Sequence, residues 1–378
     1  MLTNSELERV MAPLPSARTL PPNAYTSPDI YDVECQTIFR REWVCVARVE
    51  QVPNSGDYRT VDVAGQPIIV VRLESGTIHA MSAICLHRSM PIAEACGNAA
   101  TFQCPYHRWK YRLNGELISA PYMEGTDALQ QQNTLPAVQV ETWEGFVFVN
   151  LLGNAAPLAS RLTGLDDLVG GYSMRDMVTV STLEFSSPWN WKILVENFME
   201  AYHHIGPHRE SVQPTHHAID SYVSGSVDDG WSVVHMPQAP GQSEQSVGLP
   251  EIEGLSEKQR SETLAGAIMP TCLFLNTASV AFWYQPVPSA HDTMTLYIHT
   301  LLPRALAQGP GNEDIAKAVE ESINHIHMED ISVNEGIWRG MHAPLATQGP
   351  LSLLEESIWQ LNQWWVQRVV EHGAELPK

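Results

Sequence analysis

The sequence has few basic residues for its length. Its 378 residues contain 22 Lys and Arg against 43 Asp and Glu, which gives a formal net charge of −21 at pH 7. A chain that binds phosphate groups needs a surplus of cations to displace counterions, so this balance disfavours nucleic acid and anionic membrane surfaces. The expected partners are small molecules and other proteins.

Long apolar runs are also lacking. No stretch approaches the roughly 18 uncharged apolar residues that a membrane-spanning helix requires. The beginning of the chain, MLTNSELERVMAPLP, does not have the basic-then-apolar order of a signal peptide. We therefore expect a soluble, cytoplasmic protein.

The cysteines are few and irregularly spaced. Six cysteines in a chain of this length do not indicate a disulfide framework. A cysteine that lies within a motif is therefore expected to hold a metal, and the others to be buried.

The order of apolar and turn residues predicts two domains after a short lead-in. Residues 1–40 resemble a helical segment that packs on the second domain. Residues 41–158 contain short β-branched and aromatic runs separated by turn residues, which is typical of an all-β domain. Residues 159–378 mix strand and helix patterns, so the predicted class is α+β. Within them we expect a helix from Pro188 to Ile205 and a long loop over 224–262, a segment rich in Gly, Ser, Gln and Glu.

The strongest motif pairs cysteine with histidine twice. Cys85-Leu-His87 and Cys104-Pro-Tyr-His107 each place one thiol and one imidazole on a tight turn. In a Rieske cluster two thiolates hold one iron and two imidazoles hold the other. A structural zinc site is the alternative, because zinc also takes two Cys and two His.

A second group of possible metal ligands lies near the end of the helix predicted over 188–205. Glu200 and His203 are three residues apart and would share one helical face, while Gly206-Pro207 turns the chain so that His208 can approach the same metal. Two histidines and one carboxylate form the facial triad of non-haem iron(II) enzymes. A pair of surface or core histidines is the alternative.

The third ligand is expected on another helix. The segment Met328 to Glu335 provides three acidic candidates, of which we predict Asp330. Glu329 and Glu335 could instead be solvated helix charges.

With these motifs the chain resembles the Rieske non-haem iron oxygenases, the ring-hydroxylating family, as a catalytic alpha subunit. The resemblance implies an all-β Rieske domain beside an α+β helix-grip (START-like) catalytic domain. It assigns the [2Fe-2S] cluster to Cys85, His87, Cys104 and His107, the mononuclear Fe(II) to His203, His208 and Asp330, and catalytic roles to Glu200 and Asn197. Arg108 departs from the family, which often has a small residue there.

The resemblance also implies partners. We expect a small organic substrate, O2, a separate NAD(P)H-dependent reductase, in some systems a ferredoxin, and a homotrimer in which one subunit's cluster serves its neighbour's iron. The reaction would be hydroxylation, dihydroxylation or demethylation of an aromatic compound or a quaternary amine. Aromatic side chains that could line the pocket are Trp283, Tyr284, Tyr297 and Trp338.

A different class of protein also fits part of the sequence. A Rieske electron-transfer protein with a ligand-binding module would catalyse no reaction of its own. It would need the cluster motif alone, so the second group of ligands favours an oxygenase.

Overall fold

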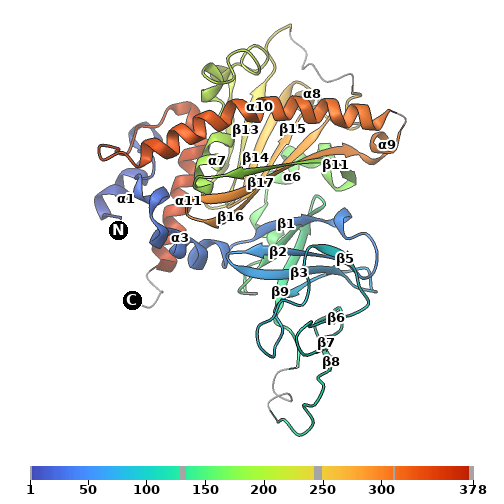
Figure 1. Ribbon diagram of the computed structural model, residues 1–378. Coiled ribbons are helices and arrows are strands. Elements are labelled where there is room, and N and C mark those ends of the chain that lie inside the picture. Colours follow the sequence, from blue (N-terminus) through green and yellow to red (C-terminus); the bar gives the residue numbers. More distant parts are fainter. Residues whose placement is uncertain (1, 128–132, 242–248, 310, 374–378) are drawn as a thin grey trace. The chain divides into compact units, whose positions relative to one another are not determined.

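The computed structural model describes residues 2–127, 133–241, 249–309 and 311–373 (Figure 1). The contacts divide the chain into two compact units. One is formed by Phe39–Leu158, and the other by Met1–Ile38 together with Ala159–Lys378. Residues at the two ends of the sequence therefore share one unit.

The smaller unit consists mainly of antiparallel strands. Its core strands are continuous apolar runs, and Ile68 to Val71 are fully buried. A seven-stranded sheet has the order β1-β10-β9-β4-β3-β2-β5, and a three-stranded sheet has the order β6-β7-β8. The elements are β1 (Val44–Arg48), η3 (Val49–Gln51), β2 (Asp57–Val63), β3 (Gln66–Arg72), β4 (Ile78–Ser82), β5 (Cys96–Asn98), β6 (Phe102–Gln103), β7 (Lys110–Tyr111), β8 (Leu117–Ser119), β9 (Ala137–Trp143) and β10 (Phe146–Asn150).

The larger unit is built on a second seven-stranded antiparallel sheet, of order β11-β17-β16-β15-β14-β13-β12. Its strands are β11 (Met177–Ser187), β12 (Tyr222–Ser226), β13 (Trp231–Pro237), β14 (Glu262–Ile268), β15 (Cys272–Asn276), β16 (Ala281–Ala290) and β17 (Thr293–Pro303). The predicted α+β class is confirmed, since long helices pack against this sheet.

Helix α10 (Asn312–Met341) is the longest helix described and runs along the sheet (Figure 1). It contacts α7, β11 and β17. The other elements are α1 (Asn4–Val10), η1 (Leu14–Ser16), α2 (Asn23–Thr26), α3 (Pro28–Glu34), η2 (Cys35–Phe39), α5 (Leu158–Arg161), α6 (Leu165–Val169), η4 (Gly170–Tyr172), η5 (Met174–Asp176), α7 (Trp191–Phe198), η6 (Tyr202–Ile205), η7 (Ala218–Asp220), α8 (Glu257–Arg260), α9 (Arg304–Ala307), η8 (Leu353–Glu355) and α11 (Glu356–Gly373).

Two predictions of local structure are wrong. The segment 224–262 is not one long loop, because its described residues include most of β12, all of β13 and α8, and the start of β14; residues 242–248 lie outside the described residues. The helix expected over 188–205 ends at Phe198, and a separate 3₁₀ turn begins at Tyr202. Glu200 therefore does not share a continuous helical face with His203.

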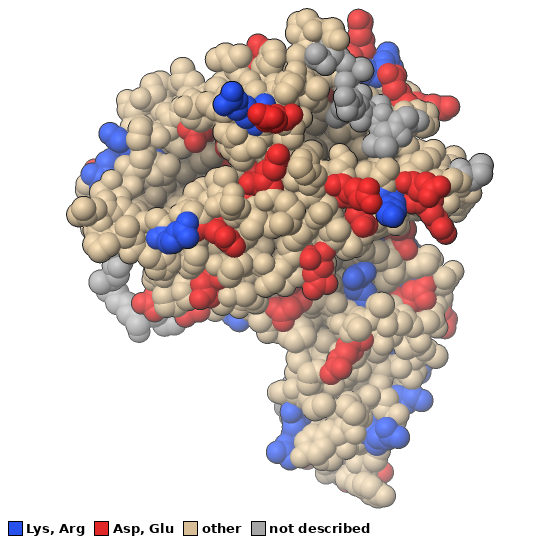
Figure 2. All heavy atoms as spheres, turned by 45° about the horizontal axis from the view of Figure 1, so that its top comes forward, with Lys and Arg blue, Asp and Glu red and all other residues tan. Residues whose placement is uncertain are grey.

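The surface is acidic over the first turns of α10. Glu313, Asp314 and Glu321 are exposed there, and Figure 2 shows acidic side chains gathered over this part of the helix. Among the described residues, no helix combines the length and the apolar character needed to cross a bilayer.

A buried ion pair connects the N-terminal segment to α7. Lys192 Nζ lies 2.5 Å from Glu34 Oε1, and both side chains are buried. The indole N–H groups of Trp191 and Trp365 donate to the same carboxylate at 2.9 and 2.6 Å. Burial lowers the pKa of Lys192, although the Glu34 carboxylate opposes this shift. The group joins α3, α7 and α11, and so fixes the helix that carries Asn197.

We expect Lys192→Met to destabilise the protein, because it leaves the Glu34 carboxylate buried without its cation. Breaking a buried pair in this way costs about 3–5 kcal/mol. Urea unfolding followed by tryptophan fluorescence measures the loss. Lys317→Met is the matched control: Lys317 is 74% exposed and lies 3.9 Å from Glu321, so this change should cost less than about 1 kcal/mol. Equal losses in the two variants would contradict the role given to the buried pair.

Candidate metal centres and pocket

Two turns of the smaller unit carry the cysteine–histidine pairs. Cys85 and His87 follow β4, and Cys104 and His107 lie between β6 and β7. In each turn the cysteine N–H donates to the carbonyl oxygen five residues later, at 2.9 and 2.8 Å, and the cysteine carbonyl accepts from the N–H four residues later, at 3.2 and 3.1 Å. The two turns thus repeat one hydrogen-bond pattern.

Each of these turns closes through a left-handed residue. Ser89 has φ of 53° and Arg108 has φ of 63°, and each lies four residues after its cysteine. This conformation favours glycine and is strained for larger side chains. The position of Arg108 explains why a small residue is common there in the family that the sequence resembles.

The four side chains on these turns fit a cluster with mixed ligands. Cys85 and Cys104 are buried in one apolar cluster with Trp109 and Tyr111. His87 Nδ1 and His107 Nδ1 lie 3.2 Å apart, close to the roughly 3 Å expected for two imidazole nitrogens that bind one metal at about 2 Å each.

Neighbouring aromatic side chains contact two of these four side chains. The His87 ring stacks on Trp109, with centroids 4.9 Å apart and planes 6° apart. The Tyr111 hydroxyl lies 3.1 Å from Cys85 Sγ and accepts from the N–H of Leu86, so it is placed to donate its hydrogen to a Cys85 thiolate. Hydrogen bonds to the sulfur atoms and burial are means by which a protein sets the potential of such a cluster.

In the larger unit, His203, His208 and Asp330 form the predicted triad. Their candidate ligand atoms all lie within 4.8 Å of one another. Asp330 Oδ1 is 3.7 Å from His203 Nε2 and 3.0 Å from His208 Nε2. His203 lies on η6, His208 follows the Gly206-Pro207 break, and Asp330 projects from α10. Two imidazoles and one carboxylate that converge in this way suit a divalent iron.

A carboxylate orients each histidine of the triad. His203 Nδ1 is 2.6 Å from Glu200 Oε1, and His208 Nδ1 is 2.7 Å from Glu329 Oε2. A ring that donates through Nδ1 leaves the lone pair on Nε2 for a metal. Both rings therefore present the same atom to the centre of the triad.

Glu200 and Glu329 are further held by their surroundings. Glu200 also accepts from the backbone N–H of His203 at 2.9 Å, and Glu329 accepts from the Ser211 hydroxyl at 2.6 Å. Asn197 Nδ2 donates to Asp330 Oδ1 at 3.3 Å. Asn197 thus contacts the predicted ligand directly.

The role of Glu329 was missed by the sequence analysis, which offered it as a rival ligand or a solvated charge. Its carboxylate faces the back of the His208 ring, whereas Asp330 lies on the Nε2 side. Glu335, the other rival, is exposed. The side chains of adjacent helix residues point about 100° apart, so Glu329 and Asp330 are expected to have different roles. Their spacing alone does not tell which of the two carboxylates is the ligand.

Burial and the neighbouring charges shift the pKa values at this centre in opposite directions. Burial raises the pKa of Asp330, but the hydrogen bond and charge of His208 outweigh it and hold that pKa below its ordinary value. Burial favours the neutral ring of His208, yet Asp330 and Glu329 together raise its pKa. The carboxylates therefore attract positive charge to this position, either a proton or a metal ion.

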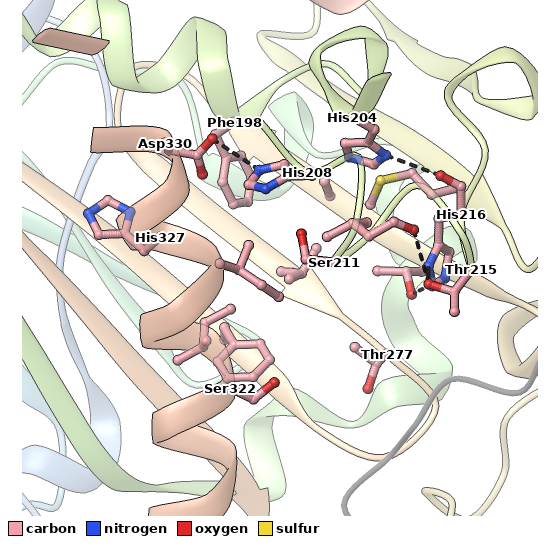
Figure 3. A pocket seen from close by; sticks show the side chains of 18 of the residues that line it. Phe198, His204, His208, Ser211, Thr215, His216, Thr277, Ser322, His327 and Asp330 are labelled. Carbon is pink, nitrogen blue, oxygen red and sulfur yellow. Dashed lines mark hydrogen bonds and ion pairs between the residues drawn. The ribbon is translucent and has the colours of Figure 1, made fainter. Parts of the chain in front are cut away.

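A pocket of about 490 Å³ adjoins the triad (Figure 3). Its lining is mainly apolar and includes Leu194, Phe198, Met236, Leu275, Phe282, Tyr284, Val319 and Ile323. A concave, mostly apolar pocket with a few polar groups is the usual form of a small-molecule site.

Of the four aromatic residues expected to line the pocket, Tyr284 does so. Trp283 is the next residue on β16, so its side chain points to the other face of the sheet, where it stacks on His299 at 4.5 Å. Tyr297 and Trp338 are absent from the described lining. The alternation along β16 instead brings Phe282 into the pocket, on the same side as Tyr284.

Three further histidines line the pocket in the neutral form. Burial lowers the pKa of His204 to about 3, helped by His203, and burial likewise lowers those of His216 and His327 to about 4. The His204 Nδ1–H donates to the carbonyl oxygen of His216 at 3.2 Å. These rings add polar atoms to the pocket without adding positive charge.

Both units match known domain families. Residues 42–140 match the Rieske [2Fe-2S] domain, and residues 174–371 match the catalytic domain of the ring-hydroxylating alpha subunit. These two matches correspond to the β unit with the paired turns and to the unit with the triad.

Similar proteins include two curated oxygenase subunits. The glycine betaine monooxygenase oxygenase subunit of Chromohalobacter salexigens is 36% identical over 193 residues, which are 51% of this chain and 43% of that protein. The carnitine monooxygenase oxygenase subunit of Acinetobacter baumannii is 29% identical over 223 residues, 58% of this chain and 57% of that protein. The matched segment spans about half the length of these relatives.

A solved structure resembles the whole chain. Naphthalene 1,2-dioxygenase from Rhodococcus sp., bound to indole, superposes with a TM-score of 0.80 at 21% identity and covers 100% of both chains. The predicted pair of domains, Rieske and helix-grip, is confirmed by this fold. Because the catalytic-domain match extends over more than half of its residues, the chain belongs to the ring-hydroxylating alpha-subunit family and carries a Rieske [2Fe-2S] domain.

Proposed function

We propose that this protein is the terminal component of a Rieske non-haem iron oxygenase, which uses O2 and electrons from a reductase to oxygenate a small organic substrate. The observation that carries the proposal is the convergence of His203, His208 and Asp330 beside a 490 Å³ pocket. An electron-transfer protein with no reaction of its own would not need a ligand triad that opens on a cavity. The two curated relatives, both named as monooxygenase oxygenase subunits, support the same reaction class.

We assign the cluster to the paired turns. Cys85 and Cys104 would hold one iron and His87 and His107 the other, as the distance between the two Nδ1 atoms supports. Buried thiols lie on one side of the site, and the half-buried histidines are the ligands closer to solvent. Electrons would thus enter and leave through the imidazole side.

We assign the mononuclear iron to His203, His208 and Asp330. When bound, a ferrous ion held by such a triad supplies open positions for dioxygen and substrate. The chain's own residues orient the ligands: Glu200 and Glu329 hold the two imidazoles, and Asn197 holds the carboxylate. The apolar side chains of the lining would pack against the substrate and position it.

The electron supply requires other chains. A separate reductase, with NAD(P)H as the source of electrons, would reduce the cluster, directly or through a ferredoxin. In a homotrimer the cluster of one subunit would serve the iron of the next, and Glu200 would connect the two centres because it bonds His203 and could accept a bond from a neighbour's His107. Glu200 is thus a proposed route between centres and not a ligand.

The cluster assignment predicts that Cys104→Ser abolishes the red-brown colour of the purified protein and the reduced-state electron paramagnetic signal of mixed Cys and His ligation, because one iron loses a thiolate. Visible and paramagnetic spectra with iron and sulfide analysis measure this. Cys96→Ser is the control, since Cys96 is exposed on β5 and lies outside the motif. A coloured Cys104→Ser protein would refute the assignment, and stoichiometric zinc without sulfide in the wild type would refute the function.

The assignment of Glu200 predicts that Glu200→Gln keeps normal iron content and normal cluster reduction while product formation falls by about 100-fold. The amide can still accept a hydrogen bond from His203, but it carries no charge. Single-turnover assays with the pre-reduced protein separate cluster oxidation from product formation. Loss of iron would make Glu200 a ligand, and full activity would remove the proposed route.

Glu329 should control iron affinity. Glu329→Leu leaves His208 Nδ1 and the Ser211 hydroxyl without their acceptor, and we expect the affinity for Fe(II) to fall about 10- to 100-fold. Titration of the iron-depleted protein with Fe(II) measures it. Glu329→Gln should restore most of the affinity, whereas Glu335→Leu, on the exposed side of the same helix, should have no effect. Unchanged affinity in Glu329→Leu would contradict the orienting role.

A further inference from the structure

The charged side chains of the pocket all have one sign. Its described lining includes the carboxylates of Glu200, Glu210 and Asp330 and no Lys or Arg. A bound ferrous ion would offset two of these three negative charges, which leaves an excess of one. Glu329, behind His208, adds a further negative charge next to the pocket.

Three hydroxyl groups that line one wall of the pocket donate their hydrogens to other groups of the protein. The hydroxyls of Ser211, Thr215 and Thr277 donate to Glu329, to the carbonyl of Val212 and to the carbonyl of Val280, at 2.6, 3.0 and 3.2 Å. Thr277 Oγ1 also accepts from the N–H groups of Ser279 and Val280, so it has no lone pair left. The hydroxyl oxygens of Ser211 and Thr215 can still offer a lone pair to a ligand.

The histidines of that wall follow the same pattern. Because Thr215 Oγ1 donates elsewhere, it accepts from His216 Nδ1 at 3.0 Å. His216 Nε2 then accepts from the Thr263 hydroxyl at 3.1 Å, and His204 Nδ1–H is used by a backbone carbonyl. In Figure 3, Thr215 and His216 lie across the pocket from Asp330. Both ring nitrogens of His216 are therefore occupied. The acceptors left on this side are the hydroxyl oxygens of Ser211 and Thr215 and the Nε2 atom of His204, in addition to the carboxylates.

Hydrogens remain for a ligand on the side of α10. Ser322 lines the pocket there, and the buried His327 Nε2 has no hydrogen-bond partner among the described residues. Such neutral donors can serve any ligand oxygen. A ligand carboxylate would still meet no cation in the described lining and would be repelled by Glu200, Glu210 and Asp330.

Aromatic faces complete the site. Phe198, Phe282 and Tyr284 line the pocket, and the rings of Phe198 and Tyr284 are 4.9 Å apart. The face of an aromatic ring attracts a cation and gives an uncharged ligand no comparable gain.

From these observations we propose that the pocket selects an organic ammonium cation that carries no carboxylate. The inference rests on the proposed oxygenase function and names its substrate class. The excess of carboxylates, the acceptor-only wall and the aromatic rings all stabilise a cation. Each of them disfavours a zwitterion, whose carboxylate meets no cationic side chain in the described lining.

The test compares three ligands of nearly the same shape by isothermal titration calorimetry with the iron-loaded, cluster-containing protein. Choline is the cation, 3,3-dimethylbutan-1-ol is its uncharged isostere, and glycine betaine is the zwitterion. We expect choline to bind at least about tenfold more tightly than either of the others. Equal or tighter binding of the uncharged alcohol or of glycine betaine would overturn the proposal.

Two variants test whether an aromatic ring of the pocket is responsible for the preference for a cation. Phe282→Leu removes a ring from the pocket and should weaken choline binding severalfold while leaving the binding of the alcohol unchanged. Tyr297→Leu, on the neighbouring strand and outside the described lining, should alter neither. Equal weakening of both ligands by Phe282→Leu would show that the ring contributes packing alone and would contradict its role toward a cation.

Iron, sulfide and visible spectra of each sample separate this proposal from the function on which it rests. A protein without iron and cluster would refute the oxygenase function. A protein with both centres intact and no preference for choline would refute the substrate class alone.

Discussion

The hydrogen bonds between the triad histidines and their carboxylates are the constraint on which the rest of the catalytic unit depends. An imidazole has two equivalent ways to meet a metal, and only a partner at Nδ1 decides that Nε2 points inward. Glu200 and Glu329 provide that partner at 2.6 and 2.7 Å. They are 129 residues apart in sequence, one just after α7 and the other in the middle of α10, so the triad exists only when these two elements are packed together.

Contacts with the rest of the unit hold α7 and α10 together. Helix α7 is fixed by the Lys192–Glu34 pair and by the indole donors of Trp191 and Trp365. Helix α10 contacts α7 and places Asp330 against Asn197 at 3.3 Å. A long helix is suited to this task, because one rigid element can carry a ligand, the partner of another ligand and part of the pocket wall in successive turns.

A feature of the fold or of the site could be predicted when the residues that form it lie close together in the sequence. The four residues proposed as cluster ligands lie within two short motifs, so their grouping followed from spacing, and the structure places them together. The α+β class was equally readable from the mixture of strand and helix patterns after residue 159. Glu329 and Asp330 could not be assigned separately, since only tertiary packing decides which of two adjacent carboxylates faces Nε2. The strands in 224–262 were missed because Val233 and Val234 are a short apolar run within polar sequence, and their neighbours in the sheet, which make them a strand, are distant in sequence.

Ligand orientation and substrate choice are linked through the same carboxylates. Each imidazole needs an acceptor at Nδ1, and in this chain both acceptors, Glu200 and Glu329, are charged carboxylates. The pocket next to them therefore remains acidic even with a divalent ion bound, and cationic side chains added to the lining would compete with that ion for the carboxylates. A substrate that brings its own positive charge avoids this conflict, because it neutralises the excess without forming a bond that displaces the metal. If the proposed ligands are correct, the carboxylates that orient them would also favour a cationic substrate, before any side chain contacts the substrate directly.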